Sequence, residues 1–319
     1  MALDVADRPP VGLWGHDYIA EWDLQTLARS TIDGQRNHGW DFVKFQPRAS
    51  CFAEAFGASY KASGSRLEPP MMVEAGVRAE GLAELIPLSM EWGPLADQIE
   101  SIGVVVESLG PDIPVIQTVF SPLMVAGYLI GDDRKALVAE LRSRPHLVLT
   151  AMNAIAEVLI DFSTRSIGEG AAGIFFAVGD YASRDVMSPD EYEDLVLPYD
   201  RKVLEEVASR SRAWFTTLHL CGPNIMHELF QALPHDALSF SVHEGGNPSL
   251  GKVVDRSRKA AMGGIDQRET LVKGSPEDAV EQTLEAAREN DGRGILIGPG
   301  CSVPPRAKGD AIRAVASAL

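Results

Sequence analysis

Two cysteines and one histidine stand at the ends of apolar stretches, in a spacing suited to metal binding. His219 and Cys221 are two residues apart at the end of the apolar run 214–221, and Cys301 ends the run 294–301. Side chains alternate along a β-strand, so residues i and i+2 face the same way and a His-x-Cys pair can hold one ion. Zinc accepts thiolate sulfur and imidazole nitrogen together. These three residues therefore predict a zinc site.

Each of these residues also has an ordinary structural interpretation. A cysteine is often a small buried hydrophobe, and a histidine near a strand end is often only hydrogen-bonded. The chain has only three cysteines, however, and Cys221 and Cys301 each stand beside a glycine. Three protein ligands leave one position for a reacting group, and the paired Cys-x-x-Cys units of structural zinc sites are absent. We expect a catalytic site, and we interpret Cys51 as a buried small residue.

The elements that would position these ligands are short apolar runs alternating with stretches of helical periodicity. This alternation is typical of βα units around a parallel sheet. Eight such runs cover residues 42–45, 85–88, 115–119, 174–178, 215–219, 238–242, 261–265 and 295–297. We predict an α/β fold, a single (β/α)8 TIM barrel.

The whole chain, residues 1–319, is predicted to be one domain, with residues 1–40 as an N-terminal extension at the barrel. A short run at 11–14 is expected to pack at the barrel mouth or bottom. Serine-proline pairs at Ser188 and Ser275 predict helix starts, because serine caps a helix and proline suits its first turn. The polar stretch 59–70 indicates a surface excursion or hairpin.

Other polar residues are predicted at the carboxyl ends of the strands, where such barrels carry their chemistry. We expect catalytic roles for Lys44, Asp180 and Tyr181, and for His16, which stands among aromatic residues near the N-terminus. A purely structural role is the alternative for His16 and Lys44. Further polar residues at these ends are Glu91, Thr118, His243, Glu244, Asp266 and Gln267. Among them, Thr118, Asp266 and Gln267 are expected to contact a cofactor.

The composition of the chain indicates which kinds of partner and which cellular compartment to expect. A net charge of −16 disfavours nucleic acid and anionic membranes as partners, since both require a basic surface. No uninterrupted apolar stretch of 18 residues is present, and residues 1–10 lack the pattern of a secretory signal. With so few cysteines, we expect a soluble protein of the reducing cytoplasm.

Several segments resemble the uroporphyrinogen decarboxylase superfamily along nearly the whole chain. They are Met-Ser-Pro-Asp-Glu-Tyr at 187–192, Leu-Pro-Tyr at 197–199, Gly-Gly-Ile-Asp at 263–266 and Ile-Gly-Pro-Gly-Cys at 297–301. The resemblance implies a (β/α)8 barrel that is often dimeric. It does not settle the reaction, because one fold serves several chemistries.

The decarboxylase branch of that superfamily is matched poorly at its active-site motifs. In place of its N-terminal arginine motif, this chain has Leu-Trp-Gly-His-Asp-Tyr at 13–18, and no arginine lies between Arg8 and Arg29. The branch's catalytic aspartate would fall near 88–90, where no carboxylate stands until Glu91. Its late active-site histidine is replaced by Cys301. Decarboxylation of a tetrapyrrole therefore remains the alternative function.

The zinc methyltransferase branch is matched at its metal motif, a His-x-Cys followed much later by a cysteine. In this chain, His219, Cys221 and Cys301 resemble that motif. For a fourth ligand, Glu244 is the first choice and His243 the second. The resemblance implies a zinc-dependent methyltransferase that moves a methyl group between a corrinoid (cobalamin) protein and a thiol or other small acceptor. It implies Zn²⁺, with methylcobalamin supplied by the partner protein, and leaves the direction of transfer open.

Overall fold

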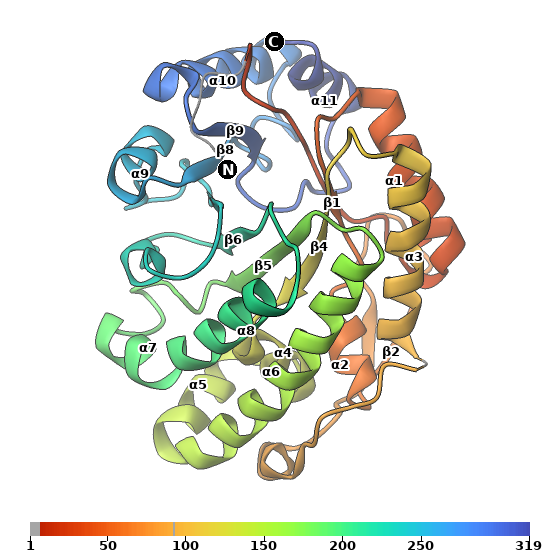
Figure 1. The fold of residues 1–319 in the computed structure, drawn as a ribbon, viewed down its shortest axis with the longest axis vertical. Coiled ribbons are helices and arrows are strands. Elements are labelled where there is room, and N and C mark those ends of the chain that lie inside the picture. Colours follow the sequence, from red (N-terminus) through yellow and green to blue (C-terminus); the bar gives the residue numbers. More distant parts are fainter. Residues whose placement is uncertain (1–6, 92) are drawn as a thin grey trace.

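Seven parallel strands form one curled sheet in the computed structural model, which describes residues 7–91 and 93–319. The strand order is β1-β4-β5-β6-β7-β8-β9, and helices surround the sheet on its outside (Figure 1). The strands are β1 (Val43–Phe45), β4 (Val115–Phe120), β5 (Gly173–Gly179), β6 (Thr217–Leu220), β7 (Ala237–Ser239), β8 (Ala260–Ile265) and β9 (Ile295–Pro299). The predicted α/β barrel class is confirmed.

The helices follow the strands in the order expected of βα units. They are α1 (Leu24–His38), α2 (Cys51–Ala55), α3 (Pro94–Leu109), α4 (Pro122–Leu129), α5 (Arg134–Ser143), α6 (Pro145–Gly168), α7 (Pro189–Leu195), α8 (Leu197–Arg210), α9 (Leu250–Ser257), α10 (Pro276–Arg288) and α11 (Gly309–Ala316). Four short 3₁₀ turns are η1 (Ala20–Trp22), η2 (Ala79–Glu84), η3 (His227–Phe230) and η4 (Glu289–Gly292). Ser188 caps α7 and Ser275 forms a capping box on α10, as predicted.

The eighth position of the barrel is taken by the N-terminal segment 10–12. The amide of Ile297 in β9 donates to the carbonyl of Pro10 at 2.8 Å, and the amide of Asp41 before β1 donates to the carbonyl of Val11 at 2.9 Å. The segment is thus hydrogen-bonded on both sides and lies between β9 and β1. The expectation that residues 11–14 pack at the barrel mouth or bottom was wrong.

The run 85–88, predicted to be a strand, is not one. It follows η2 as irregular chain, and Ile86 is 70% exposed. The physical reason is Pro87, which lacks the amide that a strand needs for pairing. The residues predicted as a surface excursion, 59–70, include β2 (Ser59–Lys61), which pairs antiparallel with β3 (Met71–Glu74).

One helix in the described part of the chain, α6, is long and apolar enough to cross a membrane by length and composition alone. Its most apolar window is 67% buried, and the helix packs against α4, α5 and α8. These contacts are those of a core helix.

Candidate metal centre

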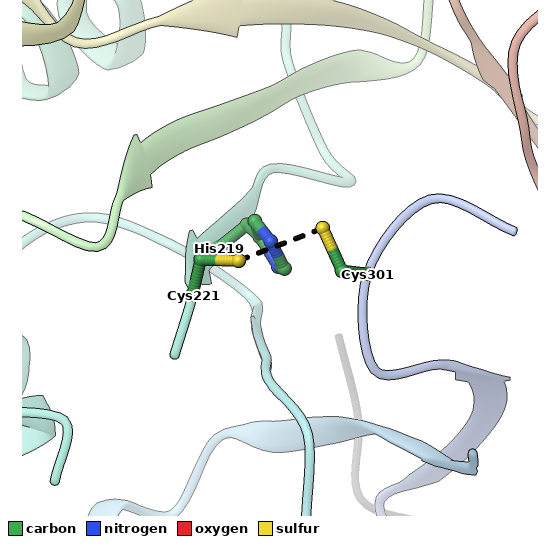
Figure 2. A group of neighbouring side chains, drawn as sticks. All are labelled: His219, Cys221 and Cys301. Atoms are coloured by element: carbon green, nitrogen blue, oxygen red, sulfur yellow. Dashed lines mark hydrogen bonds between the residues drawn. The ribbon is translucent and has the colours of Figure 1, made fainter. Parts of the chain in front are cut away.

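Three side chains from two distant parts of the sequence converge at the carboxyl ends of the strands. His219 lies on β6, Cys221 follows directly after that strand, and Cys301 follows β9 (Figure 2). One ligand atom from each residue lies within 4.8 Å of the other two, and they form the only such group of potential metal ligands among residues 7–91 and 93–319. The residues named from the sequence are therefore brought together in space.

The spacing of the two sulfur atoms suits a shared metal ion. Their distance is 3.6 Å, far longer than a disulfide bond of about 2.05 Å. Two sulfurs bound tetrahedrally to zinc at about 2.3 Å would be roughly 3.8 Å apart. All three cysteines are free thiols, so the pair is available as ligands. The donor set of two thiols and one imidazole thus fits zinc in type and spacing.

The imidazole of His219 is fixed from two sides. Its Nδ1 lies 3.1 Å from the hydroxyl oxygen of Ser239 on the neighbouring strand β7, its register partner in the sheet. Its ring stacks on Phe175 of β5 with centroids 5.1 Å apart. Because Nδ1 is engaged by Ser239, Nε2 is the nitrogen left for a ligand.

Glycines beside both cysteines let the chain take the required path. Gly222 has φ +79°, a left-handed conformation that glycine adopts without steric cost. A Cβ at Gly300 would lie 2.5 Å from the Cβ of Ser241, so only glycine permits this close approach of the β9 end to the β7 end. Asn247 also ties these loops together, because its side-chain amide donates to the carbonyls of Gly222 at 3.0 Å and Ser241 at 2.8 Å.

The two thiols share one hydrogen bond. Cys221 donates to the sulfur of Cys301, and this bond lowers the pKa of Cys301 below its ordinary value. Burial opposes the shift, while the adjacent His219 ring lowers the pKa further. The pair therefore favours a thiolate at Cys301, the form in which cysteine binds metals.

Lys44 and His16 are joined beside this centre by a hydrogen-bonded chain. The ammonium of Lys44 donates to the side-chain carbonyl of Gln46, whose amide lies 3.1 Å from Nε2 of His16. Nδ1 of His16 lies 2.7 Å from a carboxylate oxygen of the buried Glu21. Sequence reasoning found the two ends of interest, Lys44 and His16, but not the linkage between them.

Two further residues expected to be catalytic point elsewhere. Asp180 follows β5 near Gly222, but its carboxylate forms an ion pair with Arg134 of α5. Tyr181 is 6% exposed and its hydroxyl packs against Gly127 of α4, and burial raises its pKa well above the ordinary value. Their position after a strand was predicted correctly, but the structure does not bring their functional groups to the metal ligands.

The three residues expected to contact a cofactor are occupied in different ways. The hydroxyl of Thr118 donates to the carbonyl of Phe45 at 2.5 Å. The carboxylate of Asp266 accepts from the amides of Arg268 and Glu269, both at 2.9 Å, and so stabilises a turn. Gln267 is 4% exposed and its side-chain oxygen has no hydrogen-bond partner. Among these three residues, Gln267 is the one with a buried side-chain atom that lacks a hydrogen-bond partner.

Neither candidate for a fourth ligand belongs to the group. The carboxylate of Glu244 pairs with Arg268 at 3.3 Å, because the loop after β7 turns it toward the loop after β8. Nε2 of His243 lies 2.9 Å from the carbonyl of Gly264. The structure thus places Glu244 and His243 outside the group of His219, Cys221 and Cys301, and a fourth protein ligand stays a prediction.

Sequence reasoning missed the residues that support the ligands. Ser239 and Phe175 contact His219 directly, and Trp14 packs edge-on against Phe175 at 5.2 Å. Aligning the predicted strands by register would have found Ser239, since it pairs with His219 across the sheet. Trp14 could not be found in this way, because the chain there was not expected to enter the barrel.

A parallel α/β barrel with a His-Cys-Cys group at the carboxyl ends of its strands defines the class of this protein. Residues 22–319 match the model of the family described as Uroporphyrinogen decarboxylase (URO-D). This match covers well over half of the chain, and the chain belongs to the URO-D family.

Several curated relatives are methyltransferases of Methanosarcina species. Methylcobamide:CoM methyltransferase MtaA of Methanosarcina barkeri is 29% identical over 302 residues, covering 94% of this chain and 85% of the relative. Methylcobamide:CoM methyltransferase MtbA of Methanosarcina mazei is 24% identical over 289 residues, covering 89% and 80%. The names of these relatives support methyl transfer as the general activity.

Solved structures agree on the fold. A methyltransferase from Methanosarcina mazei superposes with a TM-score of 0.84 at 19% identity, covering 99% of this chain and 94% of that chain. A B12-independent methionine synthase from Shewanella sp. W3-18-1 has a TM-score of 0.61 at 17% identity, covering 92% and 86%. At these identities the likeness establishes the barrel fold alone.

Proposed function

We propose that this chain is a zinc-dependent methyltransferase acting between a corrinoid protein and a thiol or other small acceptor, in a reducing compartment. The observation that carries the proposal is the convergence of His219, Cys221 and Cys301, whose ligand atoms lie within 4.8 Å of one another. The names of the relatives support the same activity. His219 through Nε2 and the two cysteine sulfurs would hold the ion.

A zinc ion held there would lower the pKa of an incoming thiol while leaving its sulfur nucleophilic. The protein's own contribution is to fix the ligands and leave one side open. Ser239 orients the ring of His219, and Gly300 lets Cys301 approach the β7 end. Since Glu244 and His243 are engaged by other partners, the fourth position is left for the substrate sulfur.

The proposed methyl transfer requires no oxidant or reductant. The thiol loses its S–H proton to solvent, its sulfur forms a new bond to the methyl carbon, and the cobalt–carbon bond of the donor breaks with both electrons staying on cobalt. The buried rings of Trp14 and Phe175 pack edge-on beside His219, so this side of the proposed site is apolar. Transfer in the reverse direction uses the same arrangement.

Metal content and transfer are to be measured on the same preparations. Elemental analysis of the wild type should give about one zinc per chain, and the double variant Cys221→Ala, Cys301→Ala should contain none. Cys51→Ala is the matched control, because Cys51 is fully buried on α2 away from the ligands and its loss should leave zinc in place. Methyl transfer from methylcobalamin to 2-mercaptoethanesulfonate should follow the zinc content.

Two results would contradict the proposal. A wild type purified without chelator that contains no zinc would remove the metal from the mechanism. Full transfer activity in the double variant would remove the cysteines from it, and decarboxylation of a tetrapyrrole would then be assayed next.

A further inference from the structure

A buried lysine lies near the candidate metal centre. Lys44 is 7% exposed and its Nζ lies 4.6 Å from the ring centroid of Phe175 and 5.7 Å from that of Trp14. The same Phe175 ring stacks on His219. The Phe175 ring thus contacts both the ammonium of Lys44 and the proposed metal ligand His219. The ammonium therefore lies one aromatic ring away from the proposed metal site.

The ammonium is held in place by a directional chain of hydrogen bonds. Lys44 donates to Gln46, the amide of Gln46 donates to Nε2 of His16, and Nδ1–H of His16 donates to Glu21. Each group has one role along this chain, which fixes the orientation of Gln46 and the tautomer of His16. The side chain of Glu21 is fully buried, and one of its oxygens has no partner. The chain therefore links the buried amine of Lys44 to the buried carboxyl group of Glu21.

Keeping this lysine charged is costly, because no carboxylate is within ion-pair distance of it in the described parts of the chain. Burial lowers the pKa of Lys44 to about 7, and the nearby charges of Cys301 and Glu21 oppose that shift. A methionine would fill the same space without the cost, so the charge itself needs an explanation.

We propose that Lys44 is the counter-charge for a third thiolate that joins Cys221 and Cys301, and that Gln46, His16 and Glu21 are positioning residues acting through Lys44. This inference rests on the proposed function. Two cysteine thiolates already balance the charge of a divalent cation, so a substrate thiolate adds one uncompensated negative charge. The entering thiol releases its proton to solvent, and Lys44 stabilises the anion that remains.

Thiol binding by the cobalt(II)-loaded protein tests this directly, since each bound thiolate adds sulfur-to-cobalt absorption. Two probes are used, 2-mercaptoethanol, whose only ionisable group is the thiol, and 3-mercaptopropionate, which carries a second charge. In Lys44→Met the Kd of both thiols should rise by at least about tenfold, because the compensating charge is gone from a poorly screened site. Lys44→Arg should restore most of the affinity, and the cavity of about 140 Å³ that Lys44 lines offers room for the larger group.

Control variants distinguish the loss of the Lys44 charge from a general effect on folding. Lys252→Met removes an exposed lysine on α9 and should change neither Kd. Gln46→Leu should raise both Kd values less than Lys44→Met, with metal content unchanged. A melting temperature of Lys44→Met at or above that of the wild type is expected, since a buried charge is removed.

Each other outcome overturns the inference in a recognisable way. Unchanged Kd values in Lys44→Met would show that the charge is not used. A rise confined to 3-mercaptopropionate would make Lys44 a binding residue for a carboxylate and not a counter-charge. Failure of the wild type to bind cobalt or either thiol would contradict the proposed function itself, and with it this inference.

Discussion

Nδ1 of His219 lies 3.1 Å from the hydroxyl oxygen of Ser239, its register partner on the adjacent strand. Because Nδ1 is engaged in this contact, Nε2 is the nitrogen left for the proposed metal ion. The site therefore depends on the register between β6 and β7 as well as on the His-x-Cys spacing. Residues that orient a ligand in this way contribute to metal affinity without touching the metal.

Ser239→Ala should lower zinc affinity by about 10- to 100-fold, the usual effect of losing a partner that orients a ligand. Chelator competition measures the affinity. Thr217→Val is the matched control, because Thr217 is an equally buried hydroxyl on β6 that has no hydrogen-bond partner. Equal losses in the two variants would mean that the Ser239 contact is not specific.

Glu244→Gln should retain about one zinc per chain, because the carboxylate of Glu244 is paired with Arg268 and lies outside the ligand group. Elemental analysis after dialysis checks this. Loss of zinc from Glu244→Gln would show that the loop after β7 moves on metal binding and delivers a fourth ligand.

Gly300→Ala should weaken zinc binding and lower the melting temperature. The new methyl group would lie 2.5 Å from the Cβ of Ser241 and 2.8 Å from its Cα, so the chain that carries Cys301 has to shift. Gly34→Ala, inside α1 with nothing within 4 Å, should leave zinc in place and raise stability by about 0.5–1 kcal/mol. Normal zinc affinity in Gly300→Ala would contradict the steric argument.

Asp200 should make stability depend on pH. Its carboxylate accepts from the hydroxyl of Tyr192 at 2.6 Å, both residues are fully buried, and burial raises the pKa of Asp200 from 3.8 to about 7. The folded state therefore holds a proton that the unfolded state has lost between about pH 4 and 7, and stability contributed by this group falls as pH rises through that window.

Urea unfolding of Asp200→Asn should show a smaller decline between pH 4 and 7 than the wild type, since the amide does not ionise. Asp194→Asn, an exposed change on the neighbouring helix α7, should leave the wild-type pH profile intact. Parallel profiles for wild type and Asp200→Asn would show that Asp200 titrates normally in the fold.

Local patterns were enough to predict that His219, Cys221 and Cys301 lie together and that the fold is a barrel. His219 and Cys221 follow from the two-residue period of a strand, and Cys301 follows from the rule that parallel strands end at one face. The eighth strand was misplaced because runs such as 85–88 and 11–14 are too short to show a period. The pairing of Val11 with β9 is set by the whole barrel, and no local pattern encodes it.

The hydrogen-bonded chain from Lys44 to Glu21 could not be predicted from the sequence for the same reason. His16 and Lys44 are separated along the sequence by α1, and Gln46 joins them only once β1 lies beside the N-terminal segment. A sequence pattern can identify a lysine or a histidine as a candidate site residue. The direction in which its buried side chain points depends on the register of the strands and on the closure of the barrel.

The pairing of Val11 with Ile297 joins the beginning of the described chain to its last strand. Contacts so distant in sequence form slowly, because the entropy of closing a long loop must be overcome before they contribute. Trp14 lies just beyond one partner and Cys301 just beyond the other. During synthesis, a chain that still lacks β9 has neither Cys301 nor a closed barrel wall, so the three residues of the proposed metal site can come together only after nearly the whole chain has been made.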